Sequence, residues 1–468
     1  MTQNPIETRP NILIIRTDQH RYDCVGHADR YPVQTPHLDK LASEGMWFEH
    51  AFTPIAICCP SRQAFLTGKR PESFGALWNY DLGLPTGHIA HDAWAYPREM
   101  QKHGYRTAHI GKWHIHPSAG PKSFGYDSEL PMSTYTKYRK ECWPNHQTDG
   151  GIFGGVDPVP LEESRTHWLA ARAAEKISEL TQGDQPWHLH VDFPEPHLPS
   201  HPSQEYMHRF PPESIPQWGG FADTFRDKPY MQRQHQAIWG VQGWTWEDWA
   251  PIVARYYAVV AQIDDAIGTI LRQLEQSGAA DDTVVIYTTD HGDMGGSHGM
   301  VDKHYCMYDD ILRVPLIVRW PGRVAAGSRC SDFVKNALDL PPTLLQIAGS
   351  RVPPGLHGHS MASLLDGTTP PDWPQEAVST YNGQQFGLYT CRSIRTVDWK
   401  YVWNTSDVDE LYDIQNDPHE LTNRIHDPSA AEIVAELRIR LYHRLHEFGD
   451  RLVANEWMKQ SLVEGRKA

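Results

Sequence analysis

The stretch NILIIRTDQH, which spans residues 11–20, decides the fold. From Asn11 to Thr17 it is a largely apolar run, and it ends in the polar side chains of Asp18, Gln19 and His20. A short apolar run without alternation is typical of a strand that is buried on both faces of a parallel sheet. We therefore predict a buried parallel strand with polar residues at its carboxyl end.

Runs of the same kind recur along the chain, and several end in loops that bear His or Asp. They lie at residues 105–110, 187–193, 283–288 and 316–318. A long helical stretch extends from Ile252 to Glu275, and Ala64, after a Pro-Ser-Arg corner, indicates the start of another helix. Because strands alternate with helical segments, we predict an α/β fold with a large, mainly parallel sheet sandwiched by helices. Ligands of such sheets bind outside the carboxyl ends of the strands, so the polar loops are expected to converge there.

The C-terminal part of the chain has a different pattern. Residues 367–376 contain three prolines and are typical of a linker. Strand-like pieces follow, and then a helical stretch from about Ala431 to Glu447. We therefore predict two domains, a catalytic α/β domain over residues 1–370 and a smaller α+β domain over residues 371–468.

Charge and cysteine content limit the classes of partner and the compartment. The 468 residues include 43 Lys and Arg against 58 Asp and Glu, a net charge of −15, so we expect no nucleic acid and no membrane as partner. The apolar runs are far too short to cross a bilayer. The seven cysteines are scattered without a CxxC pair, and we see no secretory signal, so we expect reduced thiols in a cytoplasm.

The strongest chemical signal is the segment ICCPSRQAFLTG at residues 57–68. Here the chain resembles the sulfatase family of the alkaline phosphatase superfamily. The mark of that family is C-x-P-S-R followed by Leu-Thr-Gly, and its Cys is converted to formylglycine (3-oxoalanine). Cys58 fits the motif because Pro60 and Arg62 follow at the required spacing, whereas Cys59 does not. The alternative is a buried structural Cys pair before a proline turn.

Further elements of the family pattern follow in order, from about Pro10 to Asn423. The resemblance implies an alkaline phosphatase-like fold and a formylglycine-generating enzyme as maturation partner. It implies a divalent cation held by Asp18, Gln19, Cys58, Asp290 and His291. It also implies catalytic roles for Cys58, Arg62, Lys112, His114, His197 and Lys303, and a substrate contact at Asn79.

The residue types agree with a hard cation, because Asp18 and Asp290 supply carboxylate oxygens at strand ends. Ca²⁺ is what the resemblance implies. Mn²⁺ stays open because His291 would bring a nitrogen to the cation, and nitrogen ligands tolerate transition metals better than Ca²⁺. Mg²⁺ also stays open. Many relatives carry Asp where this chain has Gln19, and Asn where it has His291. These choices resemble the phosphonate monoester hydrolases of the same superfamily.

The mechanism implied by the resemblance is covalent catalysis. One hydroxyl of the hydrated formylglycine attacks sulfur, the departing alcohol takes a proton from His197 or Lys303, and His114 helps to expel sulfate by deprotonating the second hydroxyl. The first hypothesis is therefore a sulfatase that hydrolyses sulfate monoesters. A sulfated sugar is suggested by the tryptophans of the long insertion at residues 199–250, which are Trp218, Trp239, Trp244, Trp246 and Trp249.

Two other functions stay open. The second hypothesis is a phosphonate monoester or phosphodiester hydrolase with the same nucleophile. The third is a non-catalytic protein that binds a carbohydrate or a metal on this fold. Neither the natural substrate nor the oligomeric state follows from the sequence.

Overall fold

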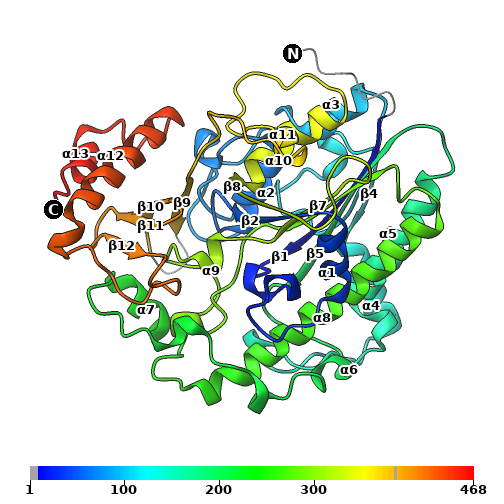
Figure 1. Cartoon of the computed structure of the whole chain (residues 1–468). Helices are drawn as coiled ribbons and strands as arrows, with labels where there is room; N and C mark the ends of the chain where they lie inside the picture. The colour runs from blue at the N-terminus through cyan, green and yellow to red at the C-terminus, as the bar shows by residue number, and fades with distance from the viewer. Residues whose placement is uncertain (1–8, 384–386, 468) are drawn as a thin grey trace.

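The fold is built on two separate sheets (Figure 1). The structure is a computed structural model and describes residues 9–383 and 387–467. Eight strands form the large sheet, in the order β4 (Ser128–Pro131), β3 (Arg106–Gly111), β5 (Trp187–Pro196), β1 (Asn11–Asp18), β6 (Thr283–Thr289), β7 (Leu316–Arg319), β2 (Met46–Phe52) and β8 (Ser328–Lys335). Strand β1 pairs in parallel with both β5 and β6, which confirms the predicted central strand.

The large sheet is mainly parallel, but β7 runs antiparallel to both of its neighbours, β6 and β2. The edge strands β4 and β8, and β2 beside β8, were not predicted. The helices are α1 (Pro36–Glu44), α2 (Cys58–Thr67), α3 (Tyr96–Lys102), α4 (Met132–Cys142), α5 (Arg165–Leu180), α6 (Gln204–Met207), α7 (Tyr230–Ile238), α8 (Trp246–Gln276), α9 (Asp309–Leu312), α10 (Asn336–Ile347), α11 (Ala362–Leu365), α12 (Ala431–Glu447) and α13 (Glu456–Val463).

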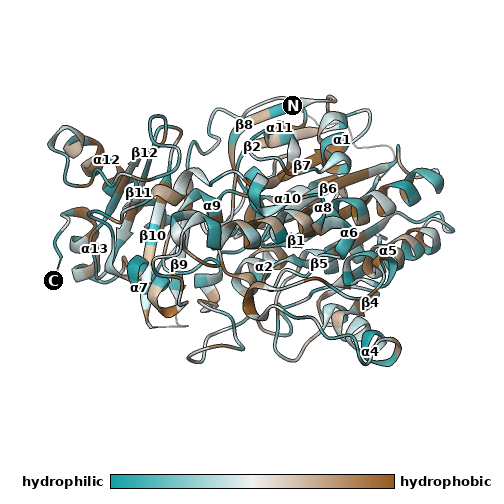
Figure 2. Cartoon of the chain, turned by 90° about the horizontal axis from the view of Figure 1, so that it is seen from below, coloured by the Kyte–Doolittle hydropathy of each residue, from teal (hydrophilic) through white to brown (hydrophobic). Residues whose placement is uncertain are grey.

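Alternate side chains of the central strands enter two different cores. Ile12 and Ile14 pack toward α2, α3, α10 and α11, whereas Leu13 and Ile15 pack toward α1, α5 and α8. All four side chains are fully buried. Figure 1 shows the two helix layers on opposite sides of the sheet, and Figure 2 shows brown, apolar colouring on the strands beside the labels β6 and β7. Burial on both faces is why these strands appear in the sequence as continuous apolar runs.

The second sheet is antiparallel and lies in the C-terminal part of the chain. Its order is β12 (Glu410–Asp413), β11 (Trp399–Asn404), β10 (Tyr389–Arg395) and β9 (Ala377–Gly383). Helix α12 packs on it through Leu437, Leu441 and Leu445. Strand β9 was not predicted. The domain boundary between residues 370 and 371 stays a prediction, although the second sheet begins shortly after it.

The structure corrects the start of the helix that carries the motif. The sequence placed that start at Ala64, whereas α2 begins at Cys58, so that the Cys-Pro-Ser-Arg segment is itself helical. A proline is tolerated there because the N–H groups of a first helical turn have no partner within the helix. The N–H of Cys59, one of these groups, donates to Oδ1 of Asn79 at 3.0 Å.

The long insertion between β5 and α8 folds into the short helices α6 and α7 and irregular segments. Among the described residues, every helix falls short of the length and apolarity that crossing a bilayer requires.

Candidate active site

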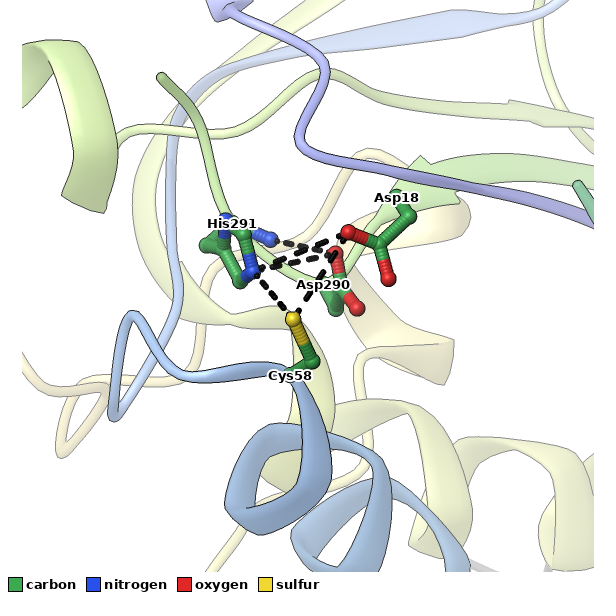
Figure 3. Close-up of side chains that lie close together, drawn as sticks. All are labelled: Asp18, Cys58, Asp290 and His291. Atoms are coloured by element: carbon green, nitrogen blue, oxygen red, sulfur yellow. Dashed lines mark hydrogen bonds and ion pairs between the residues drawn. The ribbon is translucent and has the colours of Figure 1, made fainter. Parts of the chain in front are cut away.

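Polar side chains meet at the carboxyl ends of the central strands, as the sequence predicted. Asp18 is the last residue of β1, and Asp290 directly follows β6. Helix α2 begins at the same edge and presents Cys58 in its first turn. Figure 3 shows Asp18, Cys58, Asp290 and His291 pointing toward one another from these three elements.

The four residues form a compact group of potential ligands. Their donor atoms all lie within 4.8 Å of one another. Cys58 Sγ is 3.2 Å from His291 Nε2 and 3.7 Å from Asp18 Oδ1. The other ring nitrogen, His291 Nδ1, lies 2.8 Å from the Gly292 carbonyl oxygen. A proton on Nδ1 donated to this carbonyl leaves Nε2 free to act as a ligand.

The electrostatics of this group fit a divalent cation. Burial and the neighbouring charge of Asp18 raise the pKa of Asp290. Burial lowers the pKa of His291, but Asp290 and Cys58 outweigh it and raise that pKa to about 9. Both raised pKa values have the same cause: negative charges lie close together in a buried site, so that added positive charge is stabilised there. A bound cation would favour ionised carboxylates and a neutral imidazole.

Gln19, the fifth predicted ligand, borders the same group. Its N–H donates to Asp290 Oδ1 at 3.2 Å, and its side-chain Oε1 accepts from Lys303 Nζ at 3.1 Å. Its backbone has a φ of +70°, a left-handed conformation that directs the chain sharply away from the end of β1. Its role as a ligand stays a prediction.

Arg62 bridges two of the predicted ligands, Asp18 and Asp290, by hydrogen bonds. Its guanidinium is fully buried and donates from Nε to Asp290 Oδ2 at 2.8 Å and from Nη2 to Asp18 Oδ2 at 3.0 Å. The remaining nitrogen, Nη1, donates to Asp192 Oδ1 at 3.0 Å and to the Lys112 carbonyl at 3.1 Å. The planar guanidinium therefore fixes the relative positions of three carboxylates.

Two lysines complete the positive side of the site. Lys112 Nζ is 2.6 Å from Asp18 Oδ2. Lys303 Nζ lies 2.8 Å from Asp302 Oδ1 and 3.1 Å from His197 Nε2. Burial and Asp18 raise the pKa of the unmodified Cys58 thiol, but Lys303, Lys112 and His291 outweigh them and lower it well below its usual value. Position 58 is thus a place where developing negative charge is stabilised.

The two predicted proton carriers, His114 and His197, lie at the solvent-exposed side of the group. His114 Nε2 is 3.4 Å from Asp81 Oδ2, and its ring meets that of Tyr80 edge-on at 5.3 Å. Burial lowers the pKa of His114, but Asp81 and Cys58 outweigh it and raise that pKa. The side chains of Lys112, His114 and His197 are 19%, 18% and 28% exposed, whereas Cys58 is 2% exposed. These three side chains are therefore partly open to solvent, whereas Cys58 is buried beneath them.

The remaining predicted substrate contacts, Asn79 and the insertion tryptophans, also pack against other parts of the protein. Asn79 touches the first turn of α2 through the N–H of Cys59 and lies beside the nucleophile position. Of the insertion tryptophans, Trp218 and Trp249 are 1% exposed and pack in cores, so they cannot contact a sugar. Trp239 and Trp244 are half-buried and pack in one cluster with Leu198, the residue after His197.

Sequence reasoning missed three acidic residues. Asp192 binds Arg62 from β5, Asp302 pairs with Lys303, and Asp81 pairs with His114. The signals were weak but present, because Asp302 directly precedes Lys303 and Asp81 closely follows Asn79. Asp192 ends an alternation of polar residues inside an otherwise apolar strand.

Comparisons with known proteins agree with this geometry. The family model described as Sulfatase matches residues 10–350, and the model for the C-terminal part of N-sulphoglucosamine sulphohydrolase matches residues 296–447. An ulvan-active sulfatase of Formosa agariphila is 27% identical, with 96% of this chain and 84% of the relative covered. An N-acetylglucosamine-6-O-sulfatase of Bacteroides thetaiotaomicron is 28% identical, with 89% and 82% covered.

Among solved structures, the phosphonate monoester hydrolase of Agrobacterium radiobacter superposes with a TM-score of 0.80 at 25% identity. The alignment covers 94% of this chain and 96% of that one. This likeness confirms the predicted alkaline phosphatase-like fold. Because the Sulfatase model matches most of the sequence, the chain belongs to the sulfatase family of sulfuric ester hydrolases.

Proposed function

We propose that the chain hydrolyses sulfate monoesters, with residue 58 as the nucleophile after conversion of its cysteine to formylglycine. The observation that carries this proposal is the position of Cys58, whose Sγ lies 3.2 Å from His291 Nε2 among two buried carboxylates. A structural cysteine has no need of such surroundings. The alternative of a buried Cys pair before a proline turn explains neither the ligand group nor the cationic side chains around it.

Asp18, Asp290, His291 and residue 58 would hold a divalent cation, with Gln19 as a further oxygen donor. The bound cation would polarise a sulfate oxygen and acidify the nucleophile. Ca²⁺ is the proposed ion because the carboxylates are hard oxygen donors. Mn²⁺ and Mg²⁺ are the alternatives, and the His291 nitrogen favours Mn²⁺ of the two.

Once the formylglycine at position 58 has added a water molecule across its aldehyde, one hydroxyl of the resulting diol attacks sulfur and displaces the alcohol. The second hydroxyl, on losing its proton, expels sulfate and restores the aldehyde. Lys112 and Lys303 place two ammonium groups beside residue 58, where they stabilise charge on the sulfate oxygens. His197 Nε2 and Lys303 Nζ are 3.1 Å apart, and one of the two protonates the departing alcohol oxygen. His114 takes the proton from this second hydroxyl when sulfate is expelled.

The proposed substrate is a sulfated saccharide. Two relatives are named for saccharide sulfates, and half-buried Trp239 and Trp244 lie beside the loop that bears His197. The second candidate is hydrolysis of phosphonate monoesters or phosphodiesters with the same nucleophile. It is favoured by the superposition on a phosphonate monoester hydrolase and by the choice of Gln19 and His291. Asn79 is proposed to contact the substrate at the start of α2.

The test compares turnover of nitrophenyl sulfate with that of a nitrophenyl phenylphosphonate, using chain produced with a formylglycine-generating enzyme. We expect kcat/KM to be higher for the sulfate. A higher kcat/KM for the phosphonate would establish the second candidate instead. Cys58→Ala is expected to abolish both activities. Cys59→Ala is the matched control, because Cys59 is equally buried but outside the motif spacing. Saccharide binding without turnover of any ester would favour a non-catalytic binding protein.

We also propose that the protein is matured and works in the cytoplasm. In the part of the chain that the structure describes, the seven cysteines are free thiols, and six of them are buried. Free thiols are the rule in a reducing compartment. Cell fractionation with an antibody against the chain tests this location, and recovery from the periplasm or medium would contradict it.

A further inference from the structure

A row of polar residues runs through β5, where apolar residues are expected. His188, His190 and Asp192 alternate with Leu189 and Val191, and all are at most 2% exposed. Burying polar and charged groups costs free energy, and apolar residues of similar volume often stabilise a core better. The charged end of this row, Asp192, is the one that reaches the active site, since it contacts Arg62.

Asp192 is held rigidly at the carboxyl edge of the sheet. Arg16, which lies opposite Asp192 on the neighbouring strand β1, donates to both of its carboxylate oxygens, at 2.6 and 2.9 Å. His109 Nε2 lies 2.8 Å from Oδ2. On the β3 side the backbone of Gly111 lies so close that a Cβ there would be 2.0 Å from the Asp192 carbonyl oxygen. Side chain and backbone of Asp192 therefore have little freedom.

This rigidity is passed on to Arg62. Each nitrogen of its guanidinium faces a carboxylate: Nε faces Asp290, Nη2 faces Asp18 and Nη1 faces Asp192. Without Asp192, the Nη1 donor would keep only the carbonyl of Lys112 as an acceptor. The guanidinium could then turn, and the spacing of Asp18 and Asp290 would no longer be fixed.

The charges in this group also balance. Arg16, Arg62 and Lys112 carry three positive charges, and Asp18, Asp192 and Asp290 carry three negative charges, all linked by contacts of 3.0 Å or less. Loss of Asp192 would leave an excess of positive charge beside the cation site, and loss of Arg16 would leave an excess of negative charge. In a buried site such imbalances act strongly on a divalent ion.

We propose that Asp192 is a positioning residue for the cation site: it orients Arg62 and supplies the negative charge that Arg16 and Arg62 would otherwise leave uncompensated. The inference rests on the proposed function, because it presupposes a cation at Asp18 and Asp290. It assigns Asp192, the charged end of the buried polar row of β5, to metal binding rather than to stability alone. Asp192 itself touches neither the substrate nor the proposed cation.

The test is calorimetric titration of Ca²⁺ into chelator-treated full-length protein at pH 8.5, where His109 and His190 stay neutral. Asp192→Asn is expected to weaken Ca²⁺ binding at least about tenfold. Arg16→Met removes a charge of the opposite sign from the same pair and is expected to strengthen binding. An introduced Asn keeps an amide oxygen that can accept from Arg62 Nη1, so D192N removes the charge and not the acceptor. The double variant R16M/D192N therefore restores the charge balance and is expected to bind within about threefold of wild type.

The direction in which each variant changes the Ca²⁺ affinity distinguishes a positioning role of Asp192 from a merely structural one. A structural role predicts that both single variants weaken binding, or that D192N changes only the thermal unfolding temperature, and either result would overturn the inference. If D192N does not fold, R16M and the double variant still decide, because weaker binding by R16M contradicts the charge argument. Absence of Ca²⁺, Mn²⁺ and Mg²⁺ binding by wild type would instead refute the proposed cation site.

Discussion

Replacing Arg62 by Lys tests the centre of the site, because it keeps the charge and removes the geometry. The guanidinium donates to three buried carboxylates, at 2.8 Å to Asp290 and at 3.0 Å to both Asp18 and Asp192. A lysine ammonium is a point charge on a flexible stem and cannot bridge three acceptors that lie around a planar fork. At least one of the carboxylates would then be left buried without its partner.

The expected magnitude follows from these contacts. Breaking a buried ion pair costs about 3–5 kcal/mol, a large part of the about 5–15 kcal/mol that stabilises a typical domain. Arg62 lies one helical turn after Cys58 on α2, so its displacement also moves the nucleophile position. We expect kcat/KM to fall about 10²–10³-fold, in line with the loss of one preorganised donor in an active site.

The assays are urea unfolding followed by circular dichroism, Ca²⁺ titration, and turnover of nitrophenyl sulfate. Arg392→Lys is the matched control, because Arg392, in β10 of the second sheet, is also buried and pairs with Asp450 at 2.6 Å. The control is expected to lose stability while keeping Ca²⁺ affinity and kcat. If R62K bound Ca²⁺ and turned over sulfate like wild type, our account of Arg62 would be wrong.

Three further predictions concern the cation, the leaving group and the C-terminal helix. Free Ca²⁺ at 100 times its Kd should stabilise chelator-treated protein by about 2.7 kcal/mol, and His291→Ala should reduce this gain; an unfolding temperature indifferent to chelator would contradict the site. Lys303→Met should lower kcat about 10²-fold for esters with poor leaving groups and less for nitrophenyl sulfate, whereas an equal loss across the series would remove Lys303 from leaving-group protonation. Burial raises the pKa of Glu376, but hydrogen bonds from Arg440 and Arg444 outweigh it and lower that pKa, so the contribution of Glu376 is present near neutral pH and lost on acidification. Glu376→Gln should therefore cost about 1 kcal/mol at pH 7 and flatten the stability profile between about pH 5 and pH 3, as urea unfolding would show; an unchanged slope would contradict this sign.

The central strands could be predicted because burial on both faces leaves a continuous apolar run, as in Ile12–Ile15. Strand β8 could not, because it lies at the edge of the sheet and carries the exposed polar residues Arg329 and Ser331. The direction of β7 was also beyond reach, since a short apolar run does not encode whether its neighbour is parallel or antiparallel. Helix α2 was placed too late because its first turn consists of residues that usually mark a corner.

The ligand group was within reach of the sequence because its members lie next to predicted strand ends or in a recognisable motif. Asp192 was not, because its partners Arg62 and Arg16 lie 130 and 176 residues away in the chain. Only the sheet order, which puts β5 beside β1, brings these charges together. The packing of Trp218 likewise depends on a distant residue, Arg21, whose guanidinium lies 3.8 Å from its ring centre.

The most direct test of the central claim is mass spectrometry of the peptide that contains Cys58, made beside a sulfatase assay on the same samples. Preparations with and without a co-produced formylglycine-generating enzyme would supply a range of conversion. We predict that the thiol mass at Cys58 is replaced by that of the aldehyde or its hydrate, and that activity rises in proportion to the converted fraction. Undiminished hydrolysis by protein whose Cys58 remains a thiol would contradict the assignment of residue 58 as the nucleophile.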